Sequence, residues 1–261
     1  MPLIINDEYP KKLFREDGKR LDGRDKHELR PIKMEVGVLK NADGSAYLEW
    51  GNNKIFAAVY GPRDVHPHHL AKPDMGILRV FYRMATYSVF DRKRPAPGRR
   101  EKEISMVISD CLEPVLFLEL YPGTSFEVFV EVIDADGGTR CASTTVAALA
   151  LADAGVPMRS LVTSVACGKI DGELVVDLSG IEDKAGEADL PCAMTWFNDQ
   201  LSLLQFDGEM TLDEMNTCLD LASDALKKIY DMQLNALKEK YIAIREELNN
   251  PEESPNEGGD E

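Results

Sequence analysis

The sequence changes character at Asp134-Ala-Asp-Gly-Gly-Thr-Arg-Cys-Ala-Ser-Thr-Thr145, and the rest of the chain can be organised around this stretch. Before it, residues 126–133 alternate apolar and polar side chains at period two, as a half-buried strand does. After it, the alanines and leucines of residues 147–154 are typical of a tightly packed helix. We therefore expect a strand, a sharp turn at Gly137 and Gly138, and a helix.

The same turn is a candidate anion site. The helix would begin near Thr139 with unpaired backbone N–H groups at its positive end, and glycines let an anion approach those groups closely. The neighbouring Arg140 can bind phosphate through two parallel hydrogen bonds. Short glycine-rich turns are common, so an ordinary strand-to-helix turn with a polar cap accounts for these residues equally well when they are taken alone.

The composition is that of a globular protein. With 261 residues and 44% hydrophobic content, the chain can bury a substantial core as one large or two small domains. No apolar run reaches the roughly 20 residues of a membrane span, and the first residues do not resemble a signal peptide, so we expect a cytoplasmic protein without a membrane segment. The five dispersed cysteines indicate buried thiols and no disulfide framework or metal site.

Charge is unevenly distributed along the chain. The formal net charge of −16 argues against non-specific nucleic-acid binding over the whole surface. Between Arg79 and Lys102, however, eight basic residues face only two acidic ones. Residues 251–261 carry five acidic and no basic side chains, which predicts a solvated tail.

Two arginines stand where a helix should begin. Apolar residues recur at helical spacing from Ile104 to Leu116, after Pro97 and Gly98. Arg99 and Arg100 would therefore lie in the first turn, where the helix dipole disfavours cations, so we expect an anion nearby. The alternative is a solvated helix start in which they pair with the two glutamates that follow.

The remaining pattern predicts an α+β protein. Residues 1–30 are expected to form an extended arm. A capping box at Thr211-Leu-Asp-Glu214 should open a long helix that ends at Asn249-Asn-Pro251. The other expected strands form two series, at residues 32–39, 45–50, 54–60 and 77–83, and at residues 164–170, 173–177, 188–197 and 201–206. The order suggests two related halves packed as one unit.

An acidic segment precedes one of these strands. Glu182-Asp-Lys-Ala-Gly-Glu-Ala-Asp189 places four carboxylates in eight residues, and such loops are usually just solvated. Asp189 opens an apolar strand, however, and Asp183 can loop back beside it. A carboxylate pair held in this way can bind a divalent ion or keep one group protonated at neutral pH. His66, His68 and His69 lack partnering carboxylates, so we expect an exposed loop there and no metal cluster.

Five motifs occur in an order that resembles the RNase PH family of phosphorolytic exoribonucleases, and within it the catalytic ring subunits of archaeal exosomes. They are Arg20-Leu-Asp-Gly-Arg24, Gly61-Pro-Arg63, Pro97-Gly-Arg-Arg100, Asp136-Gly-Gly-Thr-Arg140 and the segment 182–189. The resemblance covers about residues 13–247. It implies the ribosomal protein S5 domain 2-like fold, with two mixed or antiparallel strand sets packed with helices. The implied parts are an arm (1–24), two domains (25–156 and 157–247) and a disordered acidic tail (248–261).

The resemblance also implies an activity and partners. Inorganic phosphate, as co-substrate, would attack the 3′-terminal phosphodiester of single-stranded RNA and release nucleoside diphosphates, and the reverse reaction would add a 3′ tail. The chain would alternate with a homologous inactive subunit in a hexameric ring, a trimer of heterodimers, which carries RNA-binding cap subunits.

Site roles follow from the same resemblance, residue by residue. Gly138, Thr139, Arg140 and the backbone amide of Cys141 match the phosphate-binding turn. Arg99 matches an arginine that holds phosphate or the terminal RNA phosphate, Arg100 is its neighbour, and Arg63 matches an RNA-backbone contact. Asp183 matches the general acid, and Asp183 with Asp189 would coordinate Mg²⁺.

Two other functions are compatible with this pattern. One is a ring subunit that binds RNA without catalysis. The presence of the predicted site residues argues against it, namely Arg99, Arg100, Arg140, Asp183 and Asp189. The other is a nucleotide-binding kinase of similar topology, which ATP binding would reveal and which the short glycine turn disfavours. Release of monophosphates without phosphate would indicate a hydrolase.

Overall fold

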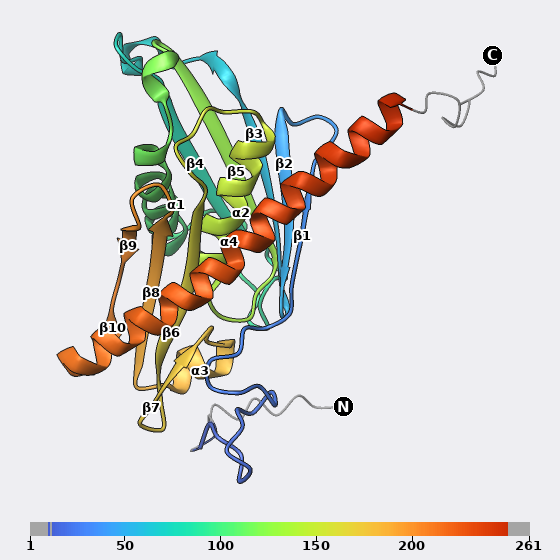
Figure 1. Cartoon of the computed structure of the whole chain (residues 1–261). Helices are drawn as coiled ribbons and strands as arrows, with labels where there is room; N and C mark the ends of the chain where they lie inside the picture. Colours follow the sequence, from blue (N-terminus) through green and yellow to red (C-terminus); the bar gives the residue numbers. More distant parts are fainter. Residues whose placement is uncertain (1–9, 11, 250–261) are drawn as a thin grey trace.

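The first of two sheets is built from the N-terminal half of the chain. The computed structural model describes Pro10 and residues 12–249. Five strands lie in the order β1-β2-β3-β5-β4 (Figure 1), namely β1 (Ile32–Val36), β2 (Gly44–Trp50), β3 (Asn53–Asp64), β5 (Thr124–Asp134) and β4 (Ile77–Met84). The expected hairpins β1-β2 and β2-β3 are confirmed. Only the β4–β5 pair is parallel, and α1 (Arg99–Leu112) belongs to the connection between these two strands.

The second sheet is antiparallel throughout. Its path is β10-β8-β6-β7, and β9 pairs with β8. The strands are β6 (Val162–Ile170), β7 (Glu173–Val176), β8 (Ala188–Thr195), β9 (Gln200–Leu204) and β10 (Asp207–Gly208). A mixed sheet and an antiparallel sheet packed with helices confirm the predicted α+β class.

Two helices join the sheets into one core. α2 (Thr139–Asp153) packs against β2, β3 and β6, and its alanine-rich sequence lets strands approach from several sides. α4 (Leu212–Asn249) crosses the second sheet diagonally and continues past it toward the C-terminus (Figure 1). The predicted capping box forms, because the Glu214 N–H donates to Thr211 Oγ1 at 3.3 Å and the Thr211 N–H donates to Glu214 Oε2 at 2.8 Å.

The acidic segment is not the loop that we expected. It begins inside a short helix, α3 (Gly180–Ala185), which leads into β8. The Ser179 N–H donates to Glu182 Oε2 at 2.8 Å, and Arg20 forms a buried ion pair with the same carboxylate. A helix of six residues has too few turns to show a helical period, and the partner of Glu182 is distant in sequence.

The described part of the arm is also not extended. Residues 12–24 fold back on the second sheet, where Asp171 Oδ2 accepts hydrogen bonds from the N–H groups of Leu13 (2.7 Å) and Phe14 (3.1 Å). Arg20 is fully buried, and its Nη1 donates to the Val176 carbonyl at 2.7 Å. The arginines of the arm find buried acceptors on the second sheet, which a charge pattern does not reveal. The expected tail at 248–261 mostly lies outside the described residues, and residues 248 and 249 belong to α4.

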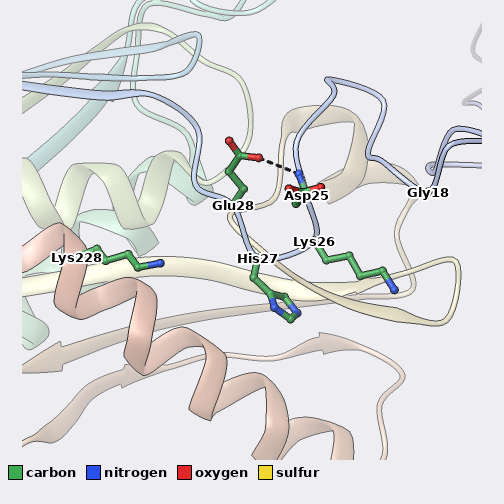
Figure 2. Close-up of a pocket in the computed structure, with 6 residues that line it drawn as sticks. All are labelled: Gly18, Asp25, Lys26, His27, Glu28 and Lys228. Carbon is green, nitrogen blue, oxygen red and sulfur yellow. Dashed lines mark hydrogen bonds between the residues drawn. The ribbon is translucent and has the colours of Figure 1, made fainter.

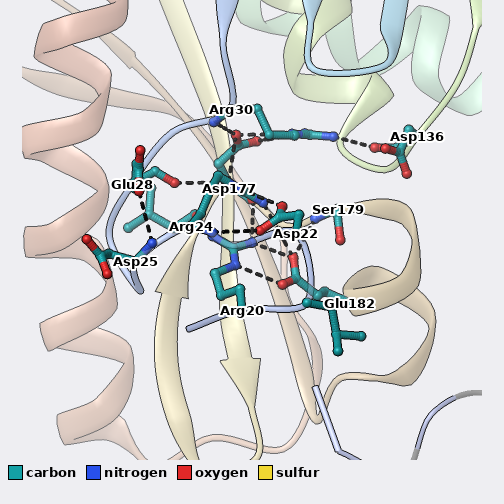
Figure 3. Close-up of polar contacts among 12 residues, drawn as sticks. Arg20, Asp22, Arg24, Asp25, Glu28, Arg30, Asp136, Asp177, Ser179 and Glu182 are labelled. Carbon is teal, nitrogen blue, oxygen red and sulfur yellow. Dashed lines mark hydrogen bonds and ion pairs between the residues drawn. The ribbon is translucent and has the colours of Figure 1, made fainter. Parts of the chain in front are cut away.

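One buried carboxylate, Asp177, ties the arm to both sheets (Figure 3). It accepts hydrogen bonds from the Arg30 N–H (2.7 Å), Arg30 Nη2 (2.7 Å) and Trp50 Nε1 (3.0 Å). Arg24 Nη1 lies 3.3 Å away. Burial opposes its charged form, yet the charge and hydrogen bonds of Arg30 hold the pKa of Asp177 below its ordinary value.

No helix within the described residues is long and apolar enough to cross a membrane. All five cysteines are free and buried, as predicted.

We expect Asp177→Asn to destabilise the protein by about 3–5 kcal/mol, because it leaves the buried Arg30 guanidinium without an ion-pair partner. Folding lowers the pKa of Asp177, so its contribution is complete above its ordinary pKa of 3.8 and is lost as the pH falls further. The difference from wild type should therefore narrow in acid. Urea unfolding at several pH values measures this.

Asp134→Asn is the matched control, because Asp134 is exposed and its side chain has no hydrogen bond in the described structure. It should change stability by less than about 0.5 kcal/mol. A similarly small effect of Asp177→Asn would contradict the central role of this carboxylate.

Candidate active site

The turn between β5 and α2 is a left-handed glycine pair. Gly137 has φ 67° and Gly138 has φ 64°, a region that other residues rarely adopt. Gly138 is the N-cap of α2, with no side chain capping the helix. A Cβ on Gly137 would lie 2.6 Å from the Gly180 nitrogen, so this turn packs directly against the start of α3. The N-terminal amides of α2 are thus offered to a ligand instead of a side chain.

Two cavities with shared lining residues lie at the turn and at the first turn of α2. One has a volume of about 340 Å³ and is lined by residues that include Lys93, Gly137, Gly138 and Thr139. The other has a volume of about 470 Å³, and its lining includes Arg140 and Asp189. Arg100, Asp183 and Lys184 line both. The structure therefore brings together the phosphate turn, one predicted arginine and the predicted carboxylate pair.

The two aspartates come from neighbouring elements. Asp183 is exposed on α3, and Asp189 lies on β8 opposite Asp207 of β10. Oδ1 of Asp189 is buried and has no hydrogen-bond partner in the described structure. Burial, together with the nearby Asp183 charge, raises the pKa of Asp189 to about 7, against the opposing effect of Arg140. Asp189 can therefore hold a proton near neutral pH.

Arg140 extends into the same cavity from the first turn of α2. Its Nη1 donates to Gln205 Oε1, and its buried Nε has no partner in the described structure. The neighbouring Thr139 accepts a hydrogen bond from the Tyr82 hydroxyl at 3.1 Å, and burial raises the pKa of Tyr82 to about 12. Tyr82 therefore remains a neutral donor that orients Thr139.

The arginines at the start of α1 differ in position. Both are exposed, but Arg100 lines both cavities and Arg99 lines neither. The alternative pairing with glutamates is not found, because Glu101 instead accepts hydrogen bonds from Lys93 Nζ (2.7 Å) and the Gly98 N–H (2.9 Å). Arg99 and Arg100 have no ion pair in the described structure. Both guanidinium groups can therefore pair with an anion from outside the chain.

Two predicted residues lie away from the cavities. Arg63 lies opposite Ser125 in the pairing of β3 with β5. Ser125 is nine residues before Asp134, the last residue of β5, so Arg63 lies about 30 Å from the turn along the strand. Its guanidinium lies 4.7 Å from the centre of the Tyr60 ring. The Cys141 side chain is buried, and burial raises the pKa of its thiol well above the ordinary value. Only the backbone of Cys141 can face a ligand, as expected.

Several residues of the site were missed from the sequence. Lys184 was counted only as part of the acidic segment, whereas Tyr82 and Gln205 lie on segments that show only strand periodicity. Asn53 is buried at the start of β3, and its Nδ2 donates to the Gly137 carbonyl at 2.7 Å. In the sequence, the role of Asn53 is indicated only by its place as a polar residue directly after Gly51 and Asn52.

The carboxylate pair fits a magnesium ion in its chemistry. Mg²⁺ is usually held by one or two carboxylates together with water and substrate phosphates. Asp183 and Asp189 supply two carboxylates, and the unpartnered buried oxygen of Asp189 needs a partner. No group of three or more His, Cys, Asp or Glu residues that could hold a metal occurs within residues 12–249. The three histidines of the 66–69 loop are exposed.

Another cavity lies away from this site, between the arm and α4 (Figure 2). It has a volume of about 600 Å³ and is lined by residues of both charge signs, among them Asp25, Lys26 and Lys228. The Asp25 N–H donates to Glu28 Oε2 at 3.0 Å. The predicted catalytic and phosphate-binding residues do not line this cavity.

Comparisons with known proteins give the family. Residues 28–157 match the 3′ exoribonuclease family, domain 1, and residues 160–225 match domain 2 of the same family. The chain is 58% identical over 237 residues to "Exosome complex component Rrp41" of Thermococcus onnurineus, covering 91% of this chain and 95% of that protein. The protein of the same description from Nitrosopumilus maritimus is 50% identical over 230 residues, covering 88% and 94% of the two chains.

The fold has a counterpart among solved structures. The crystal structure of rice Rrp46 superposes with a TM-score of 0.76 at 24% identity, covering 84% of this chain and 100% of that one. Because the identity is low, this match concerns the fold. Together with the two family matches, these similarities confirm the predicted resemblance. The chain belongs to the 3′ exoribonuclease, or RNase PH, family.

Proposed function

We propose that this chain is a phosphate-dependent 3′-to-5′ exoribonuclease and the catalytic subunit of an exosome ring. One observation carries the proposal: an uncapped helix start with Arg140 lies beside a carboxyl group whose pKa is about 7. Amides and guanidinium groups bind phosphate, and a carboxyl that is protonated near neutral pH can donate a proton. Phosphorolysis of an RNA end requires both.

In the proposed reaction, an oxygen of inorganic phosphate attacks the phosphorus of the last phosphodiester. The bond from that phosphorus to the preceding 3′-oxygen breaks, so the last nucleotide leaves as a nucleoside diphosphate and the shortened RNA keeps a 3′-hydroxyl. The amides of Gly138, Thr139 and Cys141, with Arg140, would hold the attacking phosphate in line. Arg100 and Arg99 would neutralise the phosphate of the RNA.

The leaving 3′-oxygen needs a proton, and the aspartate pair supplies it. Asp183 is exposed and lines both cavities, so a substrate can reach it and we assign it as general acid. Asp189 is the member of the pair that is protonated near pH 7. Asp189 can therefore hold a proton within the same pair of side chains as the assigned acid. In the reverse, tailing direction the same pair would act as base.

Magnesium is part of the proposal through the same aspartates. Asp183 and Asp189 would hold the ion, which when bound would neutralise charge on the phosphate groups.

RNA and ring partners complete the proposal. The relatives are described as exosome components, which supports assembly with RNase PH-like subunits in a ring. We further propose an inactive homologous partner in a hexamer, RNA-binding cap subunits and a cytoplasmic location. Arg63, about 30 Å from the turn along β5, would contact single-stranded RNA on its way to the site.

The function predicts strict phosphate dependence. The full chain, assembled with its ring partner, should shorten a 3′-ended RNA only when phosphate is present and should release nucleoside diphosphates. Chromatography of the products measures this. Monophosphates released without phosphate would establish a hydrolase, and RNA binding without turnover would establish a non-catalytic subunit.

Asp183→Ala should lower kcat by about 10²–10⁴-fold, the usual contribution of a general acid, and should leave the Kd for RNA nearly unchanged. Single-turnover kinetics and RNA binding by fluorescence anisotropy separate the two effects. Asp220→Ala, an exposed aspartate on α4, serves as control and should match wild type in both measurements. A collapse of RNA binding in Asp183→Ala would make the carboxylate structural.

Asp189 should titrate near pH 7 in phosphate-free buffer, because burial and the Asp183 charge both favour its neutral form. Carboxyl ¹³C NMR of the full chain measures the midpoint. Asp183→Asn removes the like charge and should lower this pKa, though not to the ordinary value of 3.8, because burial persists. As pH rises through about 7, the protonated fraction and the turnover of wild type should fall together. A wild-type midpoint near 3.8 would exclude this arrangement.

A further inference from the structure

We propose that Asp136 is a positioning residue that fixes the phosphate-binding turn against the helix carrying the catalytic acid. The inference rests on the proposed function, since it concerns the distance between the attacking phosphate and Asp183. Asp136 is half-buried, directly precedes Gly137 and contacts segments on both sides of the site.

The carboxylate of Asp136 holds α3. The Gly180 N–H, at the start of that helix, donates to Asp136 Oδ1 at 2.9 Å. Asp136 Oδ2 accepts a hydrogen bond from Asn52 Nδ2, also at 2.9 Å. Both carboxylate oxygens therefore have donors from the protein. This explains how an acidic side chain can lie beside an anion site, and it separates Asp136 from Asp189, whose Oδ1 has no partner.

The backbone of Asp136 holds the turn. Its N–H donates to Asn53 Oδ1 at 2.6 Å, and its carbonyl accepts a hydrogen bond from Arg30 Nη1. Asn53 also donates to the Gly137 carbonyl, so the side-chain amide of one buried residue holds the turn at the Asp136 N–H and at the Gly137 carbonyl. Figure 3 shows Arg30 extending from Asp177 to Asp136. The turn is thereby fixed to the buried centre of the protein.

The contact between turn and helix is too close for a side chain at Gly137 or Gly180. A Cβ on Gly180 would lie 2.7 Å from Asp136 Oδ1, and a Cβ on Gly137 would lie 2.6 Å from the Ser179 carbonyl carbon. Arg20 holds α3 from its other side through Glu182, the residue before Asp183. Asp136 adds a hydrogen bond to this contact, because its side chain accepts from the Gly180 N–H while its backbone belongs to the turn, and we assign the spacing of turn and helix to that bond.

The test compares Asp136→Ala and Asp136→Asn with wild type. Asp136→Ala removes the acceptor for Gly180 and should lower kcat by about 100-fold, since a displacement of about 1 Å at a reacting centre has that effect. The KM for RNA should stay near the wild-type value. Asp136→Asn keeps an oxygen for Gly180, although a neutral acceptor is weaker, and should lose less than about tenfold. Asp134→Ala, an exposed aspartate two residues earlier, is the matched control.

A second measurement does not depend on activity. Amide hydrogen exchange of the full chain should be up to about tenfold faster in Asp136→Ala at residues 180–185, because the Gly180 N–H loses its acceptor. It should also be faster at residues 137–141, because the turn loses the side-chain hydrogen bonds that join Asp136 to Gly180 and Asn52. Asp134→Ala should leave both segments unchanged. Acceleration confined to one of the two segments would overturn the role as a link.

The outcomes separate this inference from the proposed function. Wild-type turnover that needs no phosphate would refute the function, and the exchange data would then decide the link between turn and helix by themselves. An active wild type with an equally active Asp136→Ala would refute the positioning role. Equal losses in Asp136→Ala and Asp136→Asn would make the carboxylate charge itself catalytic and would also overturn the inference.

Discussion

The buried ion pair between Asp177 and Arg30 is the constraint on which the rest of the structure depends. It joins the segment before β1 to the end of β7, and Trp50 of the first sheet donates to the same carboxylate. Isolated buried charges are strongly unfavourable, so this arrangement persists only because each charge has several partners. The consequence is that the N-terminal arm, the first sheet and the second sheet must be assembled together for any of the three to satisfy these groups.

The same network reaches the candidate active site. Arg30 continues from Asp177 to the carbonyl of Asp136, and Arg20 pairs with Glu182 one residue before Asp183. The turn that offers amides to an anion and the helix that carries an acid are therefore held by side chains that also stabilise the fold. Precise spacing of reacting groups requires this kind of rigid support. Function and stability share residues here, so variants in the network need stability controls beside activity assays.

The electrostatics of the site are local. The chain carries a formal charge of −16, yet Arg100, Arg140, Lys93 and Lys184 gather around the two cavities beside the glycine turn. These cations give the cavities a local positive charge, while burial and the neighbouring Asp183 raise the pKa of Asp189 to about 7. The proposed reaction needs a bound anion and a proton donor close together, and the two cavities share one cation, Arg100, and one carboxylate, Asp183.

The sequence by itself determined the element types, because period-two and helical spacing report directly which side of each element is buried. It also determined the glycine turn, the arginine at the helix start and the carboxylate pair, since ordered motifs record the chemistry of a site. Only the tertiary structure decided that the acidic segment contains a helix, that the arm buries Arg20 and Arg24, that Arg100 and not Arg99 lines the cavities, and that Asn53 and Asp136 hold the turn. These features depend on hydrogen bonds and ion pairs between residues more than 80 positions apart, such as Arg20 with Glu182 and Asn53 with Asp136. Such pairings leave no local period in the sequence, and they exist only once the chain has folded.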